Sequence, residues 1–305
     1  MVDSAPYPVN INVRNTRIIP IVFDYYEPKS IEETLELLSK HGDKAKILAG
    51  GTDLLVKIKT GQVEPKVIIN IKKIRELRYI IEEDNLIRIG SLTTIRDLER
   101  SEVIKKHLPA LHDSVKQMGS IQIRNMATIG GNICNASPAA DTAPPLLIYN
   151  AKAVAMSING VRVIPLEEFF TGPGKTLLRP DEILTELIVE KRKDGSSSFK
   201  KITRVAVDLA IANTAVYLSV ENNIIKDIKI ALGSVAPKPV RAWETEKLLK
   251  GLLISSSDLK NKLQHIDQEI SPISDARSTA NYRRYIVKVL VYDAIETAYN
   301  RIIEG

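Results

Sequence analysis

Two short glycine-rich segments contain the residues of this sequence best suited to chemistry. They are Ala49-Gly50-Gly51-Thr52-Asp53 and Thr128-Ile129-Gly130-Gly131-Asn132. Paired glycines let the backbone approach a ligand closely because no Cβ stands in the way, and successive N–H groups can then converge on an anion. A single pair is more often a plain tight turn. Two such segments, each reached through an apolar run, favour a site that binds a diphosphate.

The first segment is positioned by a predicted helix and strand. Ser30-Ile31-Glu32-Glu33 has the pattern of a capping box, in which Ser30 and Glu33 satisfy the free amides at a helix start. Gly42 suits the left-handed end of that helix. Ala45–Leu48 then predicts a short strand that runs directly into the glycine pair.

The second segment follows a helical region. A helical pattern extends over 93–117, is broken at Pro109, and continues through 121–125 to the glycines. Short apolar or alternating runs at 67–71 and 86–89 predict strands of a mixed sheet between the two segments.

The remaining pattern predicts a hairpin and, after it, a second lobe of α+β type. Asn159-Gly160 lies between two β-type runs and predicts a hairpin with these residues in its turn. Gly172-Pro173-Gly174 and Pro180 mark a lobe boundary near residue 178. Strands are predicted at 183–189, 199–203, 215–220 and 224–232, and helices at 242–251, 256–269 and 277–302. Residues 1–20 are predicted to form an extended arm.

Composition excludes several classes of protein. The net charge of +6 comes from 43 basic and 37 acidic residues that are interleaved along the chain, and aromatic residues make up only 5%, so nucleic-acid binding is not expected. No stretch reaches the roughly 18 apolar residues of a membrane helix, so no membrane insertion is expected. Residues 1–20 lack the pattern of a secretory signal, which predicts a cytoplasmic protein.

Metal sites and catalytic side chains are not expected in this chain. The single cysteine, Cys134, cannot form an internal disulfide and supplies too few ligands for zinc or an iron–sulfur cluster. The four histidines are dispersed, and no nucleophile elbow is present. The segment 169–176 ends like a phosphate-binding loop, but its first glycine would fall on Phe169, which argues against an ATPase.

Three segments together resemble a known family. Residues 47–55, 122–141 and 169–176 are similar to the FAD-binding medium subunit of the molybdenum hydroxylases, the xanthine dehydrogenase, carbon monoxide dehydrogenase and aldehyde oxidoreductase family. The likeness runs from about residue 24 to the C-terminus, and its middle motif is long and specific. It implies a vanillyl-alcohol-oxidase-type FAD domain at 21–177, with α/β subdomains at about 21–70 and 71–177. A small α+β domain with a three-stranded sheet and a helical bundle would follow at 178–305.

The resemblance also implies which residues hold FAD. Two segments would wrap the diphosphate and the ribityl chain, namely Ile47, Leu48, Ala49, Gly50, Gly51, Thr52, Asp53 and Leu54, and Thr128, Ile129, Gly130, Gly131 and Asn132. Asp141 matches an acidic residue that contacts the adenosine part.

Three further positions would surround the flavin ring. Leu184 would pack against the ring, and Lys200 would lie near its pyrimidine edge, where a cation stabilises reduced flavin. Lys201 is an alternative match for that lysine. Met118 stands where fused xanthine dehydrogenases have an aromatic residue, so that contact is weaker or replaced.

The family's partners follow from the same resemblance. A large subunit would carry a molybdenum-pterin cofactor, a small subunit would carry two [2Fe-2S] clusters, and the expected assembly is a dimer of heterotrimers. Electrons would pass through the clusters to FAD and on to an external acceptor. Two alternatives stay open: a stand-alone FAD-dependent oxidase or reductase similar to the enolpyruvyl reductase of cell-wall synthesis, and a scaffold that binds no flavin.

Overall fold

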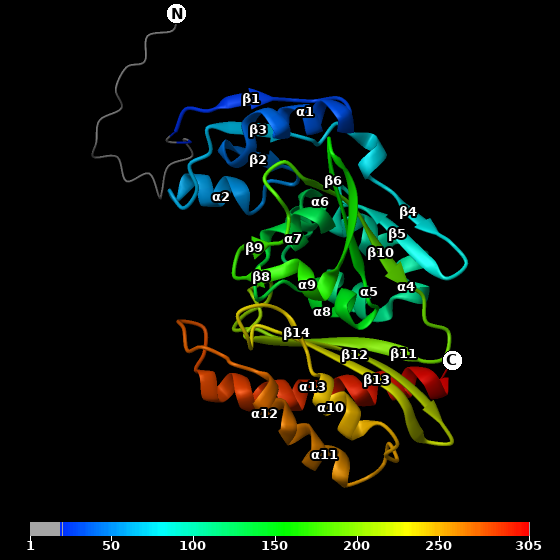
Figure 1. Ribbon diagram of the computed structural model, residues 1–305. Helices are drawn as coiled ribbons and strands as arrows, with labels where there is room; N and C mark the ends of the chain where they lie inside the picture. The colour runs from blue at the N-terminus through cyan, green and yellow to red at the C-terminus, as the bar shows by residue number, and fades with distance from the viewer. Residues whose placement is uncertain (1–18, 20, 305) are drawn as a thin grey trace, which may run out of the picture.

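The computed structural model describes residue 19 and residues 21–304, which form three blocks of secondary structure (Figure 1). The arm predicted at 1–20 therefore lies almost wholly outside the described residues. Within the described part, no helix combines the length and the apolar character needed to cross a lipid bilayer.

The first block is a three-stranded parallel sheet with two helices. Its elements are β1 (Asp24–Tyr26), α1 (Ile31–His41), β2 (Ala45–Leu48), α2 (Leu54–Lys59) and β3 (Val67–Asn70), with strand order β1-β3-β2. Helix α1 begins as predicted, because Oγ of Ser30 accepts a hydrogen bond of 3.2 Å from the N–H of Glu33. Leu35 and Leu38 of this helix pack on the sheet, and Gly42 ends the helix with φ of 51°.

The second block is a five-stranded antiparallel sheet. Its strands are β4 (Ile80–Glu82), β5 (Leu86–Gly90), β6 (Lys152–Ser157), β7 (Gly160–Pro165) and β10 (Ile183–Glu190), in the order β4-β5-β10-β6-β7. Strands β6 and β7 confirm the predicted hairpin. The turn itself differs from the prediction: Ser157 pairs with Gly160, so Ile158 and Asn159 form the tip, and Gly160 takes the positive φ alone.

Short helices complete the second block and share one apolar core with its sheet. Pro109 breaks the long predicted helical region as expected, because a proline is tolerated only in the first turn of a helix, and α5 begins at that residue. The elements are α3 (Ile95–Arg100), α4 (Glu102–His107), α5 (Pro109–Lys116), α6 (Ile121–Met126), α7 (Ile129–Asn135), α8 (Ala143–Ile148), α9 (Leu166–Phe169), β8 (Phe170–Gly172) and β9 (Lys175–Thr176).

The third block is a four-stranded antiparallel sheet covered by helices. Its elements are β11 (Ser196–Ile202), β12 (Ala212–Glu221), β13 (Ile224–Gly233), β14 (Val240–Arg241), α10 (Trp243–Leu249), α11 (Asp258–Lys262), α12 (Ile266–Glu269) and α13 (Ala280–Glu304). Helix α13 lies along one face of the sheet, and α5 and α8 of the second block contact the other face (Figure 1). The resemblance implied a three-stranded sheet here, and the structure adds a short fourth strand, β14.

The predicted domain boundary at residue 177 falls before β10. Strand β10 pairs with β5 and β6 and so belongs to the sheet of the second block. We therefore propose a boundary between Glu190 and Ser196, where the chain leaves β10 and enters β11. Gly172-Pro173-Gly174, which suggested the earlier boundary, is the tight turn of the small β8–β9 hairpin.

Candidate functional site

A cavity of about 450 Å³ lies between the first and second blocks. The first glycine segment and α2 line it from the first block. From the second block it is lined by Ser91, by most of residues 127–135 and by most of residues 178–184. Both predicted glycine segments therefore meet at one cavity, whose volume is typical of a site for a small molecule or cofactor.

The first glycine segment offers free donors to this cavity. The amides of Gly50, Gly51, Thr52 and Asp53 have no backbone acceptor within the described residues. Gly51 has φ of 84°, a conformation that favours glycine and that turns the chain from β2 into α2. Successive free N–H groups on such a turn form an anion-binding nest.

The second glycine segment uses its amides within the protein. Gly130 donates to the carbonyl of Ser91 at 3.0 Å, and Gly131 donates to Oγ1 of Thr128 at 3.1 Å. A Cβ on Gly130 would lie 2.6 Å from Cβ of Ser91, closer than real side chains approach. The N–H groups of Ile129 to Asn132 are thus paired within the protein, so this segment chiefly gives a ligand close approach to the backbone, whereas the first segment offers four free amides among the described residues.

Gly50 is where the two segments touch. A Cβ on this residue would lie 2.3 Å from the carbonyl oxygen of Met126 and 2.9 Å from Cα of Ala127. The backbone of the first block thus packs directly on the chain that enters the second glycine segment. The absence of a side chain at Gly50 sets how closely the two walls of the cavity approach.

Most of the other predicted residues also line the cavity. They are Ile47, Ala49, Leu54, Met118, Thr128, Asn132 and Leu184. The side chains of Leu48 and Ile129 instead lie in apolar clusters and do not line it. Oδ1 of Asn132 is occupied by the hydroxyl of Thr142 at 2.6 Å, which leaves the amide nitrogen of Asn132 for a ligand.

Asp141 and Lys200 are not among the residues that line the cavity. The carboxylate of Asp141 accepts hydrogen bonds from Nζ of Lys201 at 2.7 Å and from Nδ2 of Asn213 at 3.0 Å. Burial raises the pKa of Asp141, and Lys201 acts in the opposite direction. Side chains alternate along a strand, so Lys200 projects from the opposite face of β11. Of the two lysines, Lys201 therefore has the contact with Asp141.

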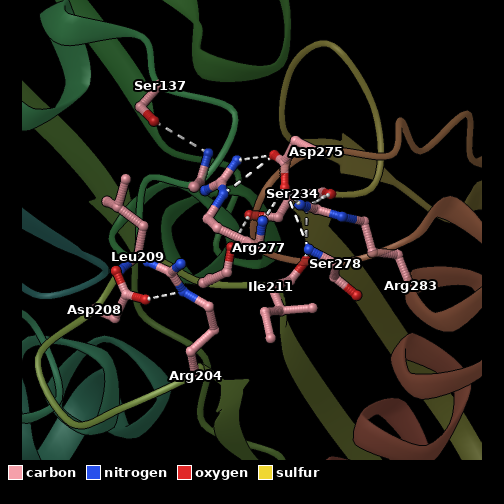
Figure 2. Close-up of polar contacts among 12 residues, drawn as sticks. Ser137, Arg204, Asp208, Leu209, Ile211, Ser234, Asp275, Arg277, Ser278 and Arg283 are labelled. Atoms are coloured by element: carbon pink, nitrogen blue, oxygen red, sulfur yellow. Dashed lines mark hydrogen bonds and ion pairs between the residues drawn. The ribbon is translucent and has the colours of Figure 1, made fainter.

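The buried Arg283 joins segments of the third block, one of which contacts the chain just before Asp141. The guanidinium of Arg283 donates to the carbonyls of Ile211 and Ser234 and to Asp275, all within 2.9 Å (Figure 2). The N–H of Ser234 in turn donates to the carbonyl of Pro138, three residues before Asp141. Hydrogen bonds from Arg277, together with the charge of Arg283, hold the pKa of Asp275 below its ordinary value.

Several cavity residues had no signal in the sequence. Lys57, Ser91 and Arg179 line the cavity although no motif points to them, and Asn135 lies in the segment 122–141 but was not predicted to hold a ligand. Ser91 Oγ is buried and has no partner within the described residues, so it is available to a ligand. Cys134 also lines the cavity, and burial raises the pKa of its thiol to about 12.

Comparison with known proteins identifies the family to which this fold and cavity belong. Residues 21–190 match the family model described as the FAD binding domain in molybdopterin dehydrogenase, and residues 197–298 match the CO dehydrogenase flavoprotein C-terminal domain. The chain belongs to the family of FAD-binding medium subunits of molybdenum hydroxylases. As such it is an oxidoreductase subunit, and the predicted α+β fold class is confirmed.

Individual members resemble the chain over nearly its whole length. It is 35% identical to the glyceraldehyde dehydrogenase medium chain of Sulfolobus acidocaldarius, covering 91% of this chain and 98% of that one. It is 34% identical to the xanthine dehydrogenase FAD-binding subunit of Escherichia coli O157:H7, covering 90% and 95%. A solved carbon monoxide dehydrogenase from Hydrogenophaga pseudoflava matches with a TM-score of 0.90 and 33% identity, covering 93% and 99%.

Proposed function

We propose that this chain is the FAD-carrying, electron-transferring subunit of a cytoplasmic, heteromeric molybdenum hydroxylase. Electrons would come from two [2Fe-2S] clusters in a small partner, after substrate oxidation at a molybdenum-pterin cofactor in a large partner, and would leave to an external acceptor. The proposed assembly is a dimer of heterotrimers. The observation that carries the proposal is the cavity between two glycine segments, in a chain of this family.

The residues that line the cavity suit FAD. The four free amides of Gly50, Gly51, Thr52 and Asp53 can donate to a diphosphate. Apolar side chains of Met118 and Leu184 line the same cavity and can pack on a flavin ring. The lack of a Cβ at Gly130 and Gly131 lets a ligand approach the backbone of the opposite wall.

In this proposal the protein supplies binding and orientation. FAD, when bound, supplies the redox chemistry of the isoalloxazine ring. The chain's own residues hold the diphosphate and shield the site from water. No histidine or tyrosine is found among the described residues that line the cavity, and Glu182 is already paired with Arg162 at 2.5 Å. The match of residues 21–190 to the FAD binding domain in molybdopterin dehydrogenase favours the electron-transferring subunit over a stand-alone oxidase or reductase.

The complex itself tests the partner proposal. A tag on this chain should recover a large and a small partner from the native source, and metal analysis should find about four iron atoms and one molybdenum per FAD. The iron and molybdenum would come from the partners, since no group of potential metal ligands is found in the described part of this chain. Recovery of this chain alone, with full catalytic activity, would instead support the stand-alone flavoenzyme.

A further inference from the structure

We propose that Lys57 is the cation that binds the FAD diphosphate and that Asn135 is the residue that positions it. The inference rests on the proposed binding of FAD. It adds a specific ligand that neither the glycine motifs nor the family resemblance suggested, because Lys57 lies outside both glycine segments.

The position of Lys57 connects the two walls of the cavity. Its Nζ, on α2 of the first block, donates a hydrogen bond of 2.5 Å to Oδ1 of Asn135, the last residue of α7 in the second block. Both residues line the cavity and both are half-buried. An ammonium group carries three donors, so two remain for a ligand after the bond to Asn135.

The other cations of the cavity are less well placed. Lys46 and Arg179 also line it, but their side chains are exposed and therefore strongly solvated. Lys57 forms no ion pair with any residue in the described part of the chain, so its charge is not neutralised by the protein there.

The carboxylates that line the cavity do not pair with Lys57. Asp43 and Asp53 line the cavity but are exposed. Glu182 is held by Arg162, and it accepts a further hydrogen bond of 2.7 Å from the N–H of Arg179. A half-buried lysine with no ion pair among the described residues, in a cavity that free amides also line, is the arrangement expected of an anion site.

A diphosphate matches this arrangement. It carries two negative charges at neutral pH, whereas the nest of Gly50 to Asp53 supplies only partial charges from N–H groups. Lysine is a compact charge that binds phosphate well, and hydrogen bonds between charged groups are about twice as strong as neutral ones. Asn135 removes freedom from the long side chain of Lys57 before the ligand binds, which lowers the entropic cost of binding.

The test is ligand affinity of the full-length chain after its flavin has been removed. Lys57→Met should weaken FAD binding by about 10- to 100-fold, the range for loss of one charge-assisted hydrogen bond. The same variant should lose affinity for ADP, a probe that keeps the diphosphate, and should bind adenosine and riboflavin as the wild type does. Lys59→Met, on the same helix but outside the cavity lining, is the matched control and should bind FAD normally.

The role of Asn135 is tested by combining variants. Asn135→Ala should weaken FAD binding less than Lys57→Met does, and it should have no further effect in the Lys57→Met background. Equal effects of Asn135→Ala in both backgrounds would overturn the positioning role. Wild-type FAD affinity in Lys57→Met, while the parent chain binds FAD, would overturn the inference alone, and failure of the parent chain to bind FAD would overturn the proposed function.

Discussion

Replacement of Gly50 with alanine should abolish FAD retention and lower the free energy of unfolding by about 3 kcal/mol or more. The new Cβ would stand 2.3 Å from the carbonyl oxygen of Met126, and that oxygen is part of the backbone and cannot rotate away. The two walls of the cavity would have to separate, which would misplace the free amides of the first segment. Thermal unfolding and the flavin content of the purified variant measure both effects.

Gly172→Ala is the matched control for this experiment. Gly172 has open space around its Cβ position and no positive φ, so alanine there should leave flavin content and stability unchanged. Full flavin content in Gly50→Ala would show that the close contact of the two segments is not needed to form the site.

Replacement of Lys201 with methionine should destabilise the chain by about 3–5 kcal/mol, because it leaves Asp141 as an unpaired buried charge. The Lys201 side chain is only 4% exposed, and the Asp141 side chain 8%, so water cannot replace the lost partner. The pair also joins β11 of the third block to the chain that follows α7, so the two blocks should separate more easily. Chemical denaturation of the two proteins gives the difference in stability.

Lys200→Met is the control that distinguishes the role of Lys200 from that of Lys201. The side chain of Lys200 forms no hydrogen bond or ion pair in the described part of the chain, so its loss should change stability by less than about 0.5 kcal/mol. If Lys200→Met were the more destabilising of the two changes, the pairing of Asp141 with Lys201 would be wrong.

Much of the fold could be predicted from local pattern. Ser30, Pro109 and the hairpin at β6 and β7 act through neighbours in the sequence, and each produced its expected element. One local detail differs from the prediction: Ser157 pairs with Gly160, so the hairpin tip lies one residue earlier. The domain boundary stays a prediction, and the glycine-rich turn that suggested it lies in the β8–β9 hairpin.

The candidate site was only partly predictable because its contacts join residues that are far apart in the sequence. The glycine segments are visible because their composition is unusual, but the donors they offer depend on pairing across the fold. Gly130 is tied to Ser91, and Lys57 meets Asn135 from 78 positions away. Such contacts cannot be predicted from the pattern of a single sequence. The choice between Lys200 and Lys201 likewise depends on which face of β11 meets Asp141.

The central claim is that FAD binds in the cavity between the two glycine segments, and the most direct test is the flavin content of the purified full-length chain. The prediction is one FAD per chain, seen as flavin absorbance and released as FAD rather than FMN or riboflavin when the protein is denatured. A folded, colourless chain that binds no FAD even after incubation with an excess of the cofactor would contradict the account.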